Sequence, residues 1–134
     1  METSDHISSL RIVGGNLALD FANTAEGTPE GKVEREHLLG YEDLAFWGRR
    51  VGLLFEADVE RLQRKSRERP AEADSVLARA IGFRFHLHRL FRAVAEGDDP
   101  PVESVETLRR FECEALSHAA LAQSGNEFGW SWEL

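Results

Sequence analysis

One carboxylate, Asp20, lies inside an otherwise apolar run of the sequence, GGNLALDFANT, residues 14–24. A polar group in such a run must either find a partner or face a cavity, because its burial without a hydrogen bond costs free energy. Asn23 and Thr24 close the run and carry the donors and acceptors that a polar cluster needs. The run therefore predicts a small polar pocket.

Arg84 is a second polar residue in an apolar pattern. Apolar residues recur around it at three- and four-residue steps, the spacing of one helical face. They are Ala80, Leu87, Phe91 and Val94 or Ala95. A buried guanidinium keeps its proton and needs an anion or several acceptors. We therefore expect Asp20 and Arg84 to form an ion pair, with Asn23 or Thr24 beside it.

Two roles fit such a pair. It could be an architectural contact that fixes one helix against another, since buried ion pairs contribute specificity more reliably than stability. It could instead form the wall of a small-molecule site, where a few convergent polar groups orient a ligand. On the second reading, the candidate ligand-binding residues are Asp20, Asn23, Thr24, Arg84 and His88.

Enzymatic activity has little support in the sequence. Asp20 could act as a general base near His88, but nothing else supplies an oxyanion site, a metal or a cofactor. Gly14 and Gly15 lack the rest of any dinucleotide-binding fingerprint, and no GxSxG sequence occurs. We therefore predict that the chain is not an enzyme and has no catalytic residues.

The histidines and the one cysteine do not form a metal-binding pattern. His86 and His88 lie two residues apart on a predicted helix, so they point about 200° from each other. Glu114 and His118 have the spacing of two ligands on one helical face, but two ligands do not make a zinc site, and Cys113 lies off that face. We predict no metal and no cofactor within this chain.

The elements that must position these residues are mostly helices. A short helix is expected to begin after Asn16, a credible N-cap. An exposed loop is expected over residues 26–37, which contain Pro29 and two glycines. In the last helix, Val105, Leu108 and Leu116 are expected on the buried face. The other helices are expected over residues 41–51, 70–97 and 102–123, with another amphipathic turn or two around residues 56–68.

The tail EFGWSWEL alternates Phe128, Trp130 and Trp132 with small or polar residues, which is typical of a strand. A lone strand leaves its backbone groups unpaired. Because the other strand candidate is residues 10–13, we predict that the two ends of the chain pair. The expected fold class is mainly α: a helical bundle of about five helices with a small two-stranded sheet pairing the N- and C-terminal segments.

Length and composition fit a single domain over residues 1–134. The net charge of −8 argues against nucleic-acid binding, and acidic residues are interleaved with the basic ones of residues 49–69. The sequence has neither a signal-peptide pattern nor an apolar run of membrane-spanning length. We expect a cytoplasmic protein without a membrane partner.

Four segments resemble, in order, the ABATE domain, the N-terminal part of the CGNR zinc-finger family of bacterial stress-induced transcription regulators. They are GGNLALDFANT, HLLGYEDLAFW, RFHLHRLFRAVAEG and FGWSWEL. The resemblance covers nearly the whole chain. Its most distinctive positions are Gly15, Leu19, Asp20, Phe21, Asn23 and Thr24.

The resemblance implies a ligand-sensing or interaction domain of a stress-induced transcription regulator, with a small molecule as a partner. Family members usually continue with a zinc-binding, basic segment that carries Cys-x-x-Cys and Cys-Gly-Asn-Arg motifs. This sequence carries none of those ligands, so zinc is expected only in such a C-terminal segment. The chain is then either a fragment of a longer regulator or a stand-alone member.

The alternative function is a stand-alone interaction or dimerisation module without catalytic activity. Exposed aromatic residues on an unpaired strand make a natural docking edge. Phe128, Trp130 and Trp132 would then join either a second copy, in a homodimer, or the zinc-binding segment of the family.

Overall fold

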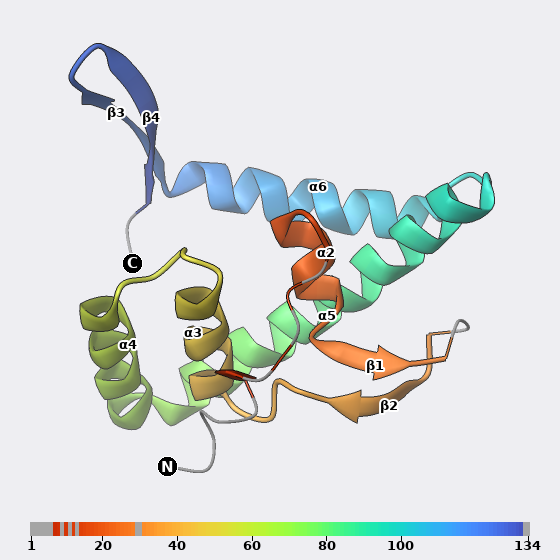
Figure 1. Ribbon diagram of the computed structural model, residues 1–134, viewed down its shortest axis with the longest axis horizontal. Coiled ribbons are helices and arrows are strands. Elements are labelled where there is room, and N and C mark those ends of the chain that lie inside the picture. The colour runs from red at the N-terminus through yellow and green to blue at the C-terminus, as the bar shows by residue number, and fades with distance from the viewer. Residues whose placement is uncertain (1–6, 9, 11, 13, 29–30, 133–134) are drawn as a thin grey trace.

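A computed structural model describes residues 7–8, 10, 12, 14–28 and 31–132 of the protein (Figure 1). Its helices are α2 (Leu17–Ala22), α3 (Tyr41–Arg50), α4 (Glu56–Glu68), α5 (Pro70–Glu96) and α6 (Val102–Ser117). Its strands are β1 (Ala25–Gly27), β2 (Val33–Glu36), β3 (Ala119–Ser124) and β4 (Glu127–Trp132). The mainly helical class predicted from the sequence is confirmed.

Local capping signals explain where the helices begin and end. The Asn16 side chain accepts a hydrogen bond of 2.9 Å from the Leu19 backbone N–H and caps α2, as predicted. The longest helix, α5, begins at Pro70 and ends at Gly97, whose φ of 75° is the left-handed conformation that favours glycine. Both ends agree with the sequence prediction. The segment 56–68 is one continuous helix with Val59 buried inward.

The core joins α2, α3 and α5 through aromatic contacts. The ring of Phe21 in α2 lies 5.2 Å from that of Trp47 in α3 and 6.2 Å from that of Phe83 in α5, between centroids. Aromatic pairs of this kind contribute about 0.5–1.5 kcal/mol each beyond their buried area. Leu38 and Leu87 are buried in the same cluster. These contacts fix α2 against α5, the two helices that carry the predicted site residues.

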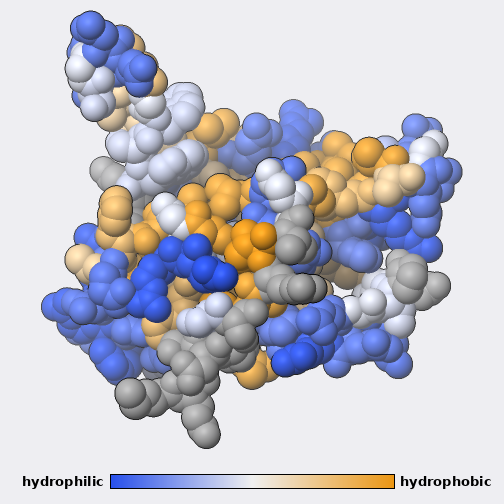
Figure 2. Space-filling view, in the orientation of Figure 1, coloured by the Kyte–Doolittle hydropathy of each residue, from blue (hydrophilic) through white to orange (hydrophobic). Residues whose placement is uncertain are grey.

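Figure 1 shows α6 lying along α5, with the β1–β2 hairpin on the other side of α5 in this view. The β3–β4 hairpin projects from the end of α6, away from the helices. Hydrophobic residues gather in the middle of the face in Figure 2, whereas α4 presents hydrophilic residues to the viewer. None of the described helices is both long enough and apolar enough to cross a lipid bilayer.

Residues 25–27 and 33–36 pair as antiparallel strands, which corrects the prediction of a loop over residues 26–37. Ala25 pairs with Glu36 and Glu26 with Arg35, and the register shifts between Glu26 and Gly27. The strand β2 reads VERE, and its first three residues are exposed. No apolar alternation marks it, so backbone pairing and the contacts of Glu36 hold the strand instead.

The C-terminal sheet also differs from the prediction. β4 is a strand, as expected, but it pairs with β3, with Leu121 opposite Trp130, whereas residues 10–13 were the predicted partner. The described residues of that segment, Leu10 and Ile12, lie in no strand. The helix α6 ends at Ser117, which leaves residues 119–124 to form β3. Gly125, with φ 63°, supplies the tight turn, and a short local loop costs less entropy than joining distant segments.

The face that α6 turns to α5 is part polar and part apolar, which corrects the predicted apolar stripe at some positions. Leu108 packs against the core, as predicted, and the ring of Phe111 lies 4.7 Å from that of Phe83 in α5, between centroids. Ser104 and Thr107 are buried, whereas Val105 and Leu116 are 43% and 47% exposed. The Ser104 hydroxyl lies 3.0 Å from Nδ1 of His86 in α5. A buried hydroxyl is accommodated because it has this partner.

Candidate functional site

A cavity of about 800 Å³ opens between the β1–β2 hairpin, the end of α2 and the middle of α5. Its volume falls in the range of about 300–1,000 Å³ that is usual for small-molecule sites. Apolar side chains of Val33, Ile81 and Phe85 form part of the wall. The charged and imidazole side chains among the lining residues are Glu26, Lys32, Arg35, His37, Arg84 and His88.

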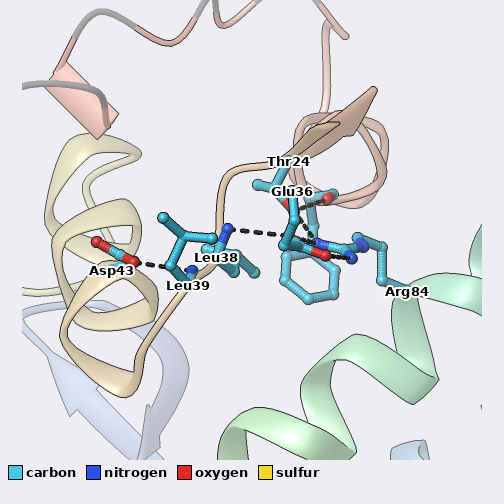
Figure 3. A network of polar contacts seen from close by, with 7 residues as sticks. Thr24, Glu36, Leu38, Leu39, Asp43 and Arg84 are labelled. Carbon is cyan, nitrogen blue, oxygen red and sulfur yellow. Dashed lines mark hydrogen bonds and ion pairs between the residues drawn. The ribbon is translucent and has the colours of Figure 1, made fainter. Parts of the chain in front are cut away.

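Arg84 is buried at one side of this cavity, where Glu36 and Thr24 bind its guanidinium (Figure 3). Its guanidinium donates to both carboxylate oxygens of Glu36, at 2.7 Å for the Nη1–Oε1 contact. Nη1 also donates to the Thr24 hydroxyl at 3.1 Å, and that hydroxyl donates to the Phe21 carbonyl at 2.7 Å. We call Arg84, Glu36 and Thr24 the Arg84 network. It joins α5, the hairpin and the end of α2.

Glu36 is held as a carboxylate by its surroundings. Partial burial raises its pKa, but hydrogen bonds from the Arg84 guanidinium and the Leu38 backbone N–H, together with the Arg84 charge, outweigh burial and lower the pKa below its usual 4.5. The Leu38 N–H lies 2.9 Å from Glu36 Oε1. The ion pair is therefore fully charged near neutral pH.

The segment that follows β2 is fixed to the start of α3 by a second carboxylate. Oδ2 of Asp43 accepts hydrogen bonds from the backbone N–H groups of Leu39, at 2.8 Å, and Gly40, at 3.0 Å (Figure 3). An acidic side chain in the first turn of a helix also interacts favourably with the helix dipole. Asp43 and Glu36 together hold residues 37–40 in place, and with them the cavity-lining His37.

Asp20 does not pair with Arg84, which corrects the central prediction from the sequence. Its Oδ1 accepts a hydrogen bond of 2.8 Å from the backbone N–H of Gly14, and the residue is buried. A carboxylate satisfied by a backbone donor needs no cation of its own. The carboxylate that pairs with Arg84 is that of Glu36. It lies in the hairpin, which was expected to be an exposed loop.

The other predicted site residues come together. Asn23, Arg84 and His88 line the cavity, and the Thr24 hydroxyl accepts a hydrogen bond from the Arg84 guanidinium. The imidazole of His88 is half-buried; its Nε2 is buried and has no hydrogen-bond partner among the residues that the structure describes. Asp20 is not among the lining residues. Ligand binding by any of them stays a prediction.

The model of the ABATE family, described as a putative stress-induced transcription regulator, matches residues 15–134. The chain belongs to the ABATE family. The match runs from the residue before the cap of α2 to the end of the sequence, so it includes all but one of the residues that line the cavity. No curated protein and no solved structure matches the chain.

Several cavity residues of this ABATE domain were missed by the sequence analysis. They lie in or next to the hairpin: Glu26, Lys32, Arg35 and His37. Glu36, the ion-pair partner of Arg84, was missed as well. The imidazole of the buried His37 lies 3.2 Å from the Glu26 carboxylate. The alternating charges of VERE, which follow a Gly-containing turn, are the one signal that could have indicated a hairpin edge.

In the described part of this ABATE domain, no three His, Cys, Asp or Glu side chains are grouped closely enough to hold a metal ion. His86 and His88 point in different directions, as predicted: the former contacts Ser104 in α6, and the latter lines the cavity. Glu114 is bound by the Arg79 guanidinium. Cys113 is exposed.

Proposed function

We propose that this chain is the regulatory domain of a stress-induced transcription regulator and that it senses a small molecule in the cavity between the β1–β2 hairpin and α5. The family description supports the regulatory role. The single observation that supports sensing is the cavity itself, about 800 Å³ in volume and bordered by the Arg84 network.

The Arg84 network suggests how a ligand would change the domain. The cavity wall comes from three elements, and Arg84 holds them together through Glu36 and Thr24. A ligand that contacts both the hairpin and α5 binds best to one arrangement of those elements. It therefore shifts the population toward that arrangement, by as much as its affinities for the alternatives differ. The downstream DNA-binding part of a regulator would respond to this shift.

The proposal includes no catalytic step and no direct contact with nucleic acid or a membrane. Asp20, the candidate general base, accepts a hydrogen bond from the Gly14 N–H and is not among the residues that line the cavity. The net charge of −8 disfavours the phosphate backbone. Zinc and DNA binding would belong to a separate C-terminal segment of the family's kind.

A substitution that fills the cavity tests this proposal in cells that carry the gene. Ile81 lies on the cavity wall, so Ile81→Trp places an indole in the ligand's space. Val94 on the same helix is 62% exposed and does not line the cavity, so Val94→Trp is the matched control. We expect Ile81→Trp to abolish the regulator's stress-dependent change in transcript levels, and Val94→Trp to preserve it. A wild-type response from a folded Ile81→Trp protein would contradict sensing in this cavity.

A second candidate function, homodimerisation, rests on the β3–β4 hairpin. Phe128, Trp130 and Trp132 alternate along β4, and the register places Leu121 on the same face, opposite Trp130. These four side chains are 52–66% exposed. An isolated two-stranded hairpin is marginally stable in water, so its apolar face needs a cover. The isologous face of a second copy would supply one.

Sedimentation velocity tests dimerisation. We expect the wild-type chain to be a dimer at high protein concentration and Trp130→Ser to be a monomer. Phe55, which is 81% exposed and lies outside the hairpin, provides the control Phe55→Ser, which should remain a dimer. A monomeric wild-type chain at every concentration would exclude this function.

A further inference from the structure

We infer that the cavity takes a small organic acid, whose anionic group binds at Lys32 and Arg35 and whose apolar part lies against Val33, Ile81 and Phe85. The inference rests on the proposed function, because it presumes that the cavity binds a small molecule. It adds the chemical class of that molecule.

The carboxylates that the structure describes leave two positive charges at the cavity without an ion pair. Arg84 has Glu36 as its anion, and the Glu26 carboxylate lies 3.2 Å from the His37 imidazole. Lys32 and Arg35 make no ion pair with any carboxylate in the described ranges 14–28 and 31–132.

Arg35 is the informative case. It lies directly opposite Glu26 in the strand register, yet the Glu26 carboxylate contacts His37 instead. Apart from the paired Arg84, two cations and one carboxylate, Glu26, therefore line the cavity, in a chain whose net charge is −8. Such a local excess of positive charge attracts an anion, and a guanidinium can bind a carboxylate or a phosphate through two hydrogen bonds.

His88 provides an independent observation. Its Nε2 is buried without a hydrogen-bond partner in the described part of the chain. Gly31, next to Lys32, lies over the imidazole, and a Cβ built there would be 3.7 Å from Cδ2 of His88. Buried polar atoms are nearly always hydrogen-bonded, so an unpartnered one in a residue that lines the cavity points to a missing partner atom. An acid group near Lys32 is a suitable partner for this nitrogen.

The apolar wall distinguishes an organic acid from a simple inorganic anion. Val33 and Phe85 are 50% and 48% exposed, and both face the cavity together with Ile81. A cavity of about 800 Å³ is also far larger than an inorganic phosphate needs. Burying an apolar group against these side chains adds affinity in proportion to the area removed from water.

Benzoate, its neutral counterpart benzamide and inorganic phosphate test the inference by NMR titration of the ¹⁵N-labelled full chain. We expect benzoate to shift cavity resonances and to bind about tenfold more tightly than benzamide, which corresponds to one charge-assisted contact. Phosphate should bind more weakly than benzoate because it makes no apolar contact. Arg35→Gln should weaken benzoate binding about tenfold. Arg64→Gln, which removes an exposed arginine of α4, should leave it unchanged.

Each other outcome has a definite meaning. Equal binding of benzoate and benzamide at the cavity would overturn the anionic class but would leave small-molecule sensing intact. Phosphate binding as tight as that of benzoate would overturn the role of the apolar wall. The absence of cavity shifts with any of the three probes would overturn the inference. The Ile81→Trp experiment in cells would then decide separately whether the cavity has a sensing role.

Discussion

Arg84 and Glu36 are 48 residues apart in the sequence, and they meet in a two-point ion pair that ties α5 to the β1–β2 hairpin. Arg84 is 4% exposed, and the Glu36 side chain is 26% exposed. An arginine cannot shed its charge when it is buried, so the fold requires an anion at this position. The ion pair thus determines where the hairpin lies, and with it one wall of the cavity.

Glu36→Gln should lower the free energy of unfolding by about 2 kcal/mol, because it leaves the buried guanidinium without an anion. The loss is smaller than for a fully enclosed pair because water reaches part of Glu36. Urea unfolding of the two proteins measures it. Glu34→Gln, at an exposed position of the same strand, is the control, with an expected change below about 0.5 kcal/mol. Equal unfolding midpoints for Glu36→Gln and wild type would contradict the role of the pair.

The same pair predicts how stability depends on pH. The pKa of Glu36 is lower in the folded protein than its usual 4.5, so the unfolded chain binds the proton first as the pH falls. The stabilisation is therefore complete above about pH 4.5 and is lost as the pH falls through the lowered pKa. Urea unfolding from neutral to acidic pH should show the difference between wild type and Glu36→Gln shrinking with acidity. A constant difference across that range would be inconsistent with an ionised Glu36.

Double-mutant cycles separate the true partner of Arg84 from the predicted one. Arg84→Met combined with Glu36→Gln should show a coupling energy of about 1–2 kcal/mol, because the two side chains are in direct contact. Arg84→Met combined with Asp20→Asn should be additive within about 0.5 kcal/mol, because Asp20 bonds to Gly14 instead. Unfolding free energies of the four variants in each cycle provide the measurement. A large coupling between Asp20 and Arg84 would restore the original prediction.

Helix boundaries could be predicted where the signal is local. Asn16 caps α2 and Gly97 ends α5 through bonds within a few residues, and both types of cap have a clear residue preference. The β1–β2 hairpin could not be predicted in this way. Its strand β2 is mostly charged and has no apolar alternation, and its anchor is Arg84, a residue far along the chain.

The candidate site was predicted in part for the same physical reason. An arginine in an apolar helical stripe must be buried with a partner, which identified Arg84 from spacing alone. The choice of partner between two carboxylates, Asp20 and Glu36, depends on tertiary geometry. The Asp20 carboxylate accepts its hydrogen bond from the backbone N–H of Gly14, and no pattern of residue types in the sequence predicts such a bond.

The hydrogen bond between the Gly14 N–H and Asp20 needs a residue without a side chain at position 14, which gives a further prediction. A Cβ at Gly14 would lie 2.7 Å from Cβ of Leu19 and 2.8 Å from Oδ1 of Asp20, so Gly14→Ala forces the backbone away from the carboxylate. We expect Gly14→Ala to lower the unfolding free energy by about 1–3 kcal/mol, the usual cost of overpacking.

The matched control for Gly14→Ala is another glycine in open surroundings. Gly82 lies exposed within α5, and a Cβ there would meet nothing within 4 Å. Since alanine favours the helix over glycine, Gly82→Ala should raise the unfolding free energy by about 0.5–1 kcal/mol. Urea unfolding should therefore show that the two variants change the unfolding free energy in opposite directions. If Gly14→Ala were as stable as wild type, the close approach of Gly14 to Asp20 would not be needed, and Asp20 would be free to take another partner.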